Sequence, residues 1–125
     1  MSENTDRYES AVARYLEAWN AGGPDALAKA VAAAWSADGG YTDPLADVRG
    51  HEGIAAVISA AHEQFPGFSF RLAGRVDGHH DIARFGWELV DDADGSAPVA
   101  GSDVITLDAD GRIRTVHGFL DRVPA

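Results

Sequence analysis

The stretch DIARFGWELV, residues 81–90, decides the fold of this chain because its side chains alternate in character. One set of alternate positions is Ala83, Phe85, Trp87 and Leu89, and the other is Ile82, Arg84, Gly86 and Glu88. Successive side chains of a β-strand point to opposite faces of a sheet, whereas a helix repeats about every 3.6 residues. The alternation therefore predicts a strand over 81–90 whose first set of side chains faces a hydrophobic core.

Three more segments with a two-residue period flank this strand. They are 68–77, 99–107 and 112–120, and turns rich in Asp and Gly separate them. Connections of this kind join strands that run in opposite directions. We therefore expect four consecutive strands joined by hairpins to form an antiparallel sheet.

The first half of the chain has helical spacing instead. Apolar residues recur three and four positions apart over 5–20, and Gly22-Gly23-Pro24 ends this amphipathic helix. A second helix, which we expect to end at Gly39-Gly40, has the apolar stripe Leu27, Val31, Ala34 and Trp35. The segment 41–45 is a short strand or extended link, and a third helix follows over 52–64. Helices that precede a run of strands predict an α+β fold with the helices on one face of the sheet.

Length and composition favour a single domain over residues 1–125. The 46% of hydrophobic residues is enough for one core, and no apolar run reaches a membrane-spanning length. The net charge of −10 argues against nucleic acid as a partner, because a phosphate backbone attracts clustered Lys and Arg. The chain has no cysteine, which excludes disulfides and thiolate sites. We expect a soluble, cytoplasmic protein with no membrane partner.

Two acidic residues require an explanation beyond surface solvation. Asp43 follows Tyr41-Thr42 and precedes Pro44, so it is either a turn residue or a base held at the end of a buried strand. Asp103 shares the parity of the apolar side of its strand, where a carboxylate is costly unless it is solvated, paired or protonated. A pair with Arg84 is one alternative for Asp103.

A twisted sheet wrapped around helices encloses a conical cavity, and large side chains on the inner faces are candidates for its lining. Ordinary core packing is the alternative for each of them. The expected pocket residues are Trp19, Trp35, Phe65, Phe85, Trp87, Val116 and Leu120.

Three segments resemble the catalytic segments of ketosteroid isomerase, in the nuclear transport factor 2-like superfamily that also holds the SnoaL-like polyketide cyclases. They are ARYLE at 13–17, YTDPL at 41–45 and GSDV at 101–104. The resemblance implies a cystatin-like α+β roll, in which a cone-shaped, curved antiparallel sheet wraps around three N-terminal helices. It also implies that Asp43 is the general base and that Tyr15 and Asp103 are the two donors of an oxyanion hole.

The resemblance further implies cofactor-free acid–base chemistry, without a metal, on a small apolar carbonyl compound. A base removes a proton next to the carbonyl, and hydrogen-bond donors stabilise the enolate, so that a double bond migrates. Trp35 and Ala61 stand where the isomerase family has supporting tyrosines.

Several alternatives share this fold. They are a SnoaL-like polyketide aldol cyclase, a hydrolase resembling limonene-epoxide hydrolase, and a non-catalytic ligand-binding or dimerisation module. The hydrolase alternative requires Arg84 to point inward. The outer face of the sheet, with Ile82, Val104 and Phe119, is apolar enough that we expect a homodimer.

Overall fold

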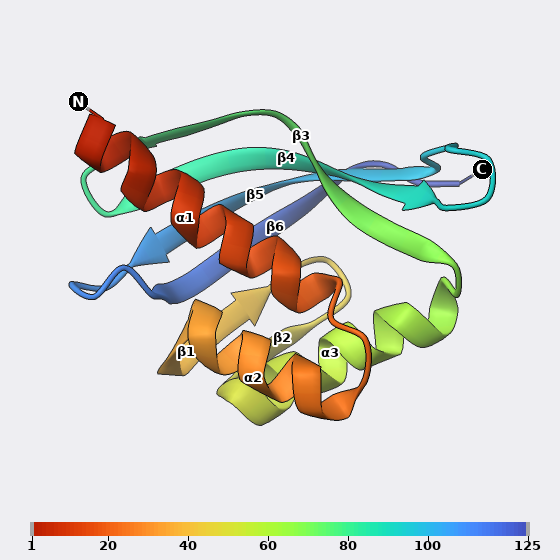
Figure 1. The fold of residues 1–125 in the computed structure, drawn as a ribbon, viewed down its shortest axis with the longest axis horizontal. Helices are drawn as coiled ribbons and strands as arrows, with labels where there is room; N and C mark the ends of the chain where they lie inside the picture. Colours follow the sequence, from red (N-terminus) through yellow and green to blue (C-terminus); the bar gives the residue numbers. More distant parts are fainter. Residues whose placement is uncertain (1, 125) are drawn as a thin grey trace.

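The computed structural model describes residues 2–124, with side chains from residue 6 onward, and Figure 1 shows its fold. In this range there are three helices, α1 (Ser2–Trp19), α2 (Pro24–Ala34) and α3 (His51–Gln64). The strands are β1 (Trp35–Thr42), β2 (Asp47–Arg49), β3 (Phe68–His79), β4 (Ile82–Asp91), β5 (Val99–Leu107) and β6 (Ile113–Arg122). Among the residues described, none of the helices combines the length and hydropathy that crossing a membrane requires.

The strands form one curved sheet in the order β2-β1-β6-β5-β4-β3. Figure 1 shows α1 lying across one face of the long strands, with α2 and α3 beside β1 and β2. The expected α+β fold is confirmed, as are the four consecutive antiparallel strands β3 to β6. One detail differs from a purely antiparallel sheet, because β1 pairs with β6 in parallel.

The second helix is shorter than its apolar spacing indicates. We expected Trp35 on its buried stripe and Gly39-Gly40 at its end, and both expectations are wrong. The helix ends at Ala34, and Trp35 pairs with Ile113 of β6 as the first residue of β1. A Cβ atom at Gly39 would lie 2.7 Å from Cδ1 of Trp35, so the glycine gives the buried indole the room it needs in this irregular part of the strand. Pairing with β6 overrides the helical spacing of the sequence.

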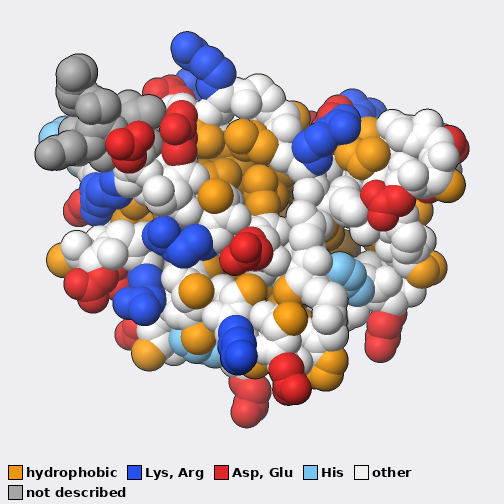
Figure 2. Space-filling model, viewed as in Figure 1, with side chains coloured by type: hydrophobic (Ala, Val, Ile, Leu, Met, Phe, Trp, Pro, Cys, Tyr) orange, Lys and Arg blue, Asp and Glu red, His pale blue; other side chains and the backbone are white. Residues whose placement is uncertain are grey.

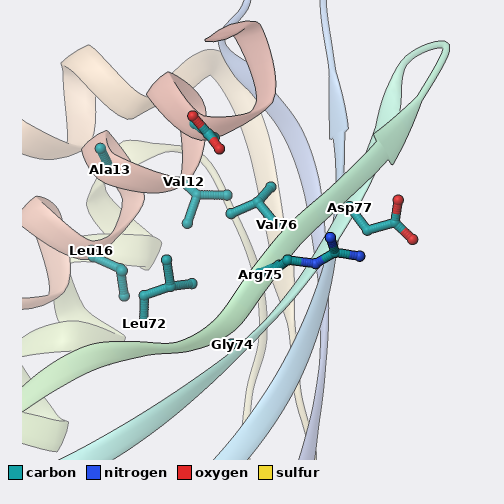
Figure 3. Close-up of a pocket in the computed structure, with 9 residues that line it drawn as sticks. Val12, Ala13, Leu16, Leu72, Gly74, Arg75, Val76 and Asp77 are labelled. Carbon is teal, nitrogen blue, oxygen red and sulfur yellow. The ribbon is translucent and has the colours of Figure 1, made fainter. Parts of the chain in front are cut away.

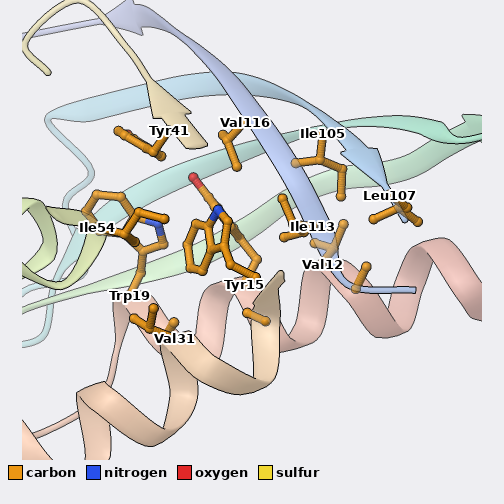
Figure 4. Close-up of a cluster of buried hydrophobic side chains, with 14 of the residues drawn as sticks. Val12, Tyr15, Trp19, Val31, Tyr41, Ile54, Ile105, Leu107, Ile113 and Val116 are labelled. Atoms are coloured by element: carbon orange, nitrogen blue, oxygen red, sulfur yellow. The ribbon is translucent and has the colours of Figure 1, made fainter. Parts of the chain in front are cut away.

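The hydrophobic core lies between the helices and the concave face of the sheet. Figure 4 shows side chains of α1, α2 and α3 meeting those of β1, β5 and β6. On β5 every second residue from Val99 to Leu107 is buried, and Asp103 is one of them. The strand parity that placed Asp103 among buried residues is therefore confirmed.

Truncation of a core leucine tests this packing. We expect Leu107→Ala to lower the free energy of unfolding by about 2–5 kcal/mol, because Leu107 is 1% exposed and a cavity would remain. Leu45→Ala removes the same atoms from a side chain that is 82% exposed, and it should cost less than about 0.5 kcal/mol. Denaturant unfolding of both variants measures the difference, and equal losses would contradict the assigned core.

Candidate functional site

A cavity of about 650 Å³ opens between helices α1 and α3 and the sheet. Its wall is largely apolar, and α3 contributes small side chains that leave the space open. The polar side chains in the lining are Tyr15, Tyr41, Asp43 and Gln64. Such a cavity, with few polar groups in an apolar wall, is typical of a small-molecule site.

Tyr15 and Asp103 form a buried pair beside this cavity. Tyr15 projects from α1, and its hydroxyl donates to Oδ2 of Asp103 over 2.5 Å. The indole N–H of Trp87 donates to Oδ1 of the same carboxyl over 3.1 Å. Asp103 is only 2% exposed, so these two donors replace the water that burial removes. The site therefore holds a carboxyl group with both oxygens occupied.

Burial raises the pKa of Asp103 to about 6, against an ordinary value of 3.8. The two hydrogen bonds to Tyr15 and Trp87 lower it, and the charges of Asp43 and Asp121 raise it further. Asp103 thus holds a proton at a higher pH than an exposed aspartate. Burial also raises the pKa of Tyr15 and of Tyr41 above the ordinary value of 10.0. Both phenols therefore remain hydrogen-bond donors at neutral pH.

Asp43 stands at the end of β1 and lines the cavity. Its Oδ1 accepts the backbone N–H groups of Leu45 and Ala46, each over 2.8 Å. Its Oδ2 accepts the hydroxyl of Tyr41 over 2.6 Å. The two alternatives for Asp43 are therefore compatible, because the turn bonds that begin at Asp43 also hold its carboxyl group at the cavity.

The side chains of Asp103 and Asp43 both approach Gly118 of β6. A Cβ atom at Gly118 would lie 2.8 Å from Oδ1 of Asp103 and 3.4 Å from Cβ of Asp43. Glycine thus allows strands β1, β5 and β6 to bring the two acids to one place. The structure brings together all three residues expected to carry chemistry, namely Tyr15, Asp43 and Asp103.

The expected pocket lining requires a correction. Trp19, Phe65, Trp87 and Leu120 line the cavity. Trp35, Phe85 and Val116 are instead buried in the core. The rings of Trp35 and Phe85 pack against the ring of Tyr15, with centroids 5.4 Å and 5.3 Å away. Tyr15 occupies the space that these rings would otherwise face.

Sequence reasoning missed Tyr41, although the segment that contains it was singled out. The available signal is its spacing, since residues two apart on a strand share a face and Asp43 follows Tyr41 by two. Trp35 provides no replacement for a supporting tyrosine, because its indole nitrogen has no hydrogen-bond partner among the described residues. Ala61 is part of the cavity wall.

Arg84 lies outside the site. Its side chain is 75% exposed and pairs with Asp77 over 3.3 Å. The alternative that pairs Arg84 with Asp103 is therefore wrong, because Tyr15 and Trp87 occupy that carboxyl group. Arg84 also does not point inward, as the hydrolase alternative requires. Strand parity explains both outcomes, since Arg84 and Phe85 point to opposite faces of β4.

A second hollow, about 660 Å³ in volume, lies between α1 and β3. Figure 2 shows hydrophobic side chains in the hollow beside α1, and Figure 3 shows the residues that line it. Its charged residues are Glu9, Arg75 and Asp77, and all three are exposed. The hollow lacks the buried, hydrogen-bonded acids that distinguish the first cavity.

The raised pKa of Asp103 predicts a pH-dependent stability that Asp103→Asn removes. The folded protein binds this proton more tightly than the unfolded chain, so the free energy of unfolding falls as pH rises from about 4 to above 6, by about 3 kcal/mol. Asn has no titratable proton, so Asp103→Asn should not show this loss of stability as pH rises.

Denaturant unfolding of the wild type and of Asp103→Asn at about pH 4 and about pH 7.5 measures the difference in pH dependence. The control is Asp110→Asn at an exposed position, which should keep the dependence of the wild type. Equal pH dependence in the wild type and Asp103→Asn would contradict the prediction.

Comparison with known proteins places this chain in a family. Residues 12–116 match the family model of the SnoaL-like domain. No curated protein matches the chain. The solved structure of a proposed isomerase of the SnoaL-like family from Agrobacterium tumefaciens is 42% identical, with a TM-score of 0.86 over 92% of this chain and 97% of that chain.

More distant structures share the fold. A proposed SnoaL-like polyketide cyclase from Jannaschia is 20% identical over 94% of this chain and 87% of its own, with a TM-score of 0.73. A SnoaL-like protein of unknown function from Burkholderia thailandensis is 16% identical over 91% and 94%, with a TM-score of 0.69. Because the family model spans most of the chain and a solved relative is 42% identical over nearly all of it, the protein belongs to the SnoaL-like family of the nuclear transport factor 2-like superfamily.

Proposed function

We propose that this protein is a cofactor-free isomerase that moves a double bond in a small apolar carbonyl compound through an enolate. The observation that carries the proposal is the Tyr15–Asp103 pair, which lies with Asp43 at one apolar cavity. A base and a neutral oxygen-binding donor at one site are the two requirements of enolisation. The 42% identical relative described as a proposed isomerase supports the same class of reaction.

The cavity favours an apolar substrate with one polar end. Aromatic rings of Trp19, Phe70 and Trp87 and small side chains of α3 form its wall. Burial of apolar surface contributes about 25 cal/mol per Å², so the hydrocarbon part of a ligand supplies most of the binding free energy. A carbonyl oxygen is best placed at the Tyr15 hydroxyl, because an unpaired oxygen against the apolar wall is costly.

Asp43 is the base of the proposed reaction. An ionised carboxylate offers about four lone-pair positions, and Leu45, Ala46 and Tyr41 occupy three of them. One position on Oδ2 remains for a substrate proton. Asp43 removes a proton from a carbon next to the carbonyl group and returns it to another carbon, so that the double bond moves and the base is regenerated.

Asp103 acts on the substrate oxygen through Tyr15. When Asp103 is neutral, its O–H donates to the phenol oxygen of Tyr15, and Tyr15 then donates its own hydrogen to the enolate oxygen. Direct donation by Asp103 is disfavoured because its oxygens face Tyr15 and Trp87. Donors held in a water-poor site stabilise developing charge better than donors in water.

The proposal is tested with a β,γ-unsaturated ketone in heavy water, with proton exchange and double-bond migration followed by NMR. We expect the wild type to convert the ketone and Asp43→Asn to reduce kcat/KM by about 10²–10⁴-fold, because the amide cannot accept the proton. Asp38→Asn changes an exposed aspartate on the same strand and should leave the rate unchanged.

Undiminished activity in Asp43→Asn would remove Asp43 from the mechanism. A wild type that neither exchanges protons nor shifts the double bond, in this ketone or in larger apolar ketones, would overturn the isomerase proposal. Formation of a carbon–carbon bond would instead indicate an aldol cyclase, in which the same enolate attacks a second carbonyl.

We also propose that the protein is a homodimer that pairs through the outer face of the sheet. Ile82 and Phe119 are exposed there, and Phe119 is 61% exposed. Val104 lies between them on β5 and is half-buried. A second copy would cover these exposed apolar side chains.

Light scattering should give a mass of two chains for the wild type. Phe119→Asp places a charge in the proposed interface and should reduce the mass to one chain, whereas Leu45→Asp, at an exposed position on the cavity rim, should not. A wild-type mass of one chain would contradict the homodimer.

A further inference from the structure

The hydroxyl of Tyr41 contacts Asp43, the proposed base, although the proposed reaction does not itself use Tyr41. Its hydroxyl lies 2.6 Å from Oδ2 of Asp43, and this oxygen is the one with a lone pair left for a substrate proton. A donor at that oxygen affects where the remaining lone pair points.

The position of Tyr41 is fixed by its strand and by aromatic packing. It pairs with Val48 of β2 and with Val116 of β6, so the central part of β1 is held from both sides. Its ring packs against Trp19 of α1, with centroids 5.6 Å apart. A buried ring held in this way leaves its hydroxyl little freedom to leave Asp43.

The turn after β1 completes the arrangement. Leu45 and Ala46 hold Oδ1 through backbone N–H groups, and the N–H of Asp43 donates to the carbonyl of Ala46 over 2.9 Å. Rotation of the carboxyl group would break the bonds at both oxygens. Without Tyr41, only the turn would hold the carboxyl group, and Oδ2 would have no donor from the described residues.

We propose that Tyr41 is a positioning residue of the base, which holds Oδ2 of Asp43 toward the cavity. The role of Asp43 as a base rests on the proposed function, whereas its hydrogen bond with Tyr41 does not. Removal of the Tyr41 hydroxyl leaves Oδ2 without its donor, so that end of the carboxyl group is free to turn away from the substrate.

The other ionisable groups around Asp43 do not replace this donor. Asp103 of β5 lies across Gly118 and repels a second negative charge. Tyr15 of α1 donates to Asp103, and Asp47 of β2 accepts the hydroxyl of Thr42. None of the ion pairs formed by the described residues includes Asp43. Among the described residues, Tyr41 is thus the side chain that donates to the proposed base.

The test is Tyr41→Phe, which removes one oxygen and keeps the buried ring. A small displacement of a catalytic group costs up to about 10²-fold in rate, so kcat for the ketone should fall by about 10–100-fold. KM for the ketone should change less than about twofold, because the apolar wall remains. A crystal structure of the substrate-free variant should show the Asp43 carboxyl group rotated from its wild-type orientation, because Oδ2 has lost its donor.

Tyr8→Phe is the matched control. The hydroxyl of Tyr8 donates to the backbone carbonyl of His80 over 2.8 Å, away from the cavity lining, so its removal should change neither kcat nor the orientation of the Asp43 carboxyl group. An Asp43 carboxyl group that keeps its wild-type orientation in Tyr41→Phe would overturn the inference even if the wild type is an active isomerase. An inactive wild type would overturn the proposed function alone, because the structure of the variant still decides whether Tyr41 holds Asp43 in place.

Discussion

The hydrogen bond between Tyr15 and Asp103 is the interaction on which the site depends. It joins the first helix to the middle of the sheet at a point that water does not reach. A buried carboxyl group without a partner would cost several kcal/mol, so Asp103 requires both Tyr15 and Trp87. Tyr15 in turn requires the rings of Trp35 and Phe85 to hold it. The core and the site are therefore one packed unit.

The absence of a side chain at Gly118 is as important to the site as Asp43 and Asp103 themselves. Gly118 lies beside the side chains of both acids, and even a methyl group there would contact Asp103 too closely. The approach of two acids favours protonation of one of them, since like charges repel in a medium of low polarity. The structure thereby holds one buried acid, whose pKa is raised to about 6, and a second acid that accepts three hydrogen bonds. The proposed acid–base reaction assigns a different role to each of them.

Much of this arrangement could be predicted from the sequence. The alternation over 81–90 and 99–107 identified the strands and the buried parity of Asp103, because side-chain direction on a strand depends only on position. The second helix shows where such reasoning fails. Trp35 fits the helical stripe of α2, yet its pairing with Ile113, which is distant in the sequence, makes it a strand residue. Local spacing contains no information about that partner.

The α+β class, the four long antiparallel strands and the candidate residues Tyr15, Asp43 and Asp103 follow from the sequence alone, through its periodicity and the resemblance of short segments. The folded chain was needed to show which aromatic rings line the cavity and which support Tyr15. It also decided that Arg84 faces outward and that Tyr41 donates to Asp43. These outcomes depend on strand curvature, register and the close approach of β1, β5 and β6 around Gly118. Such distances arise from packing between segments far apart in the chain, and no local pattern fixes them.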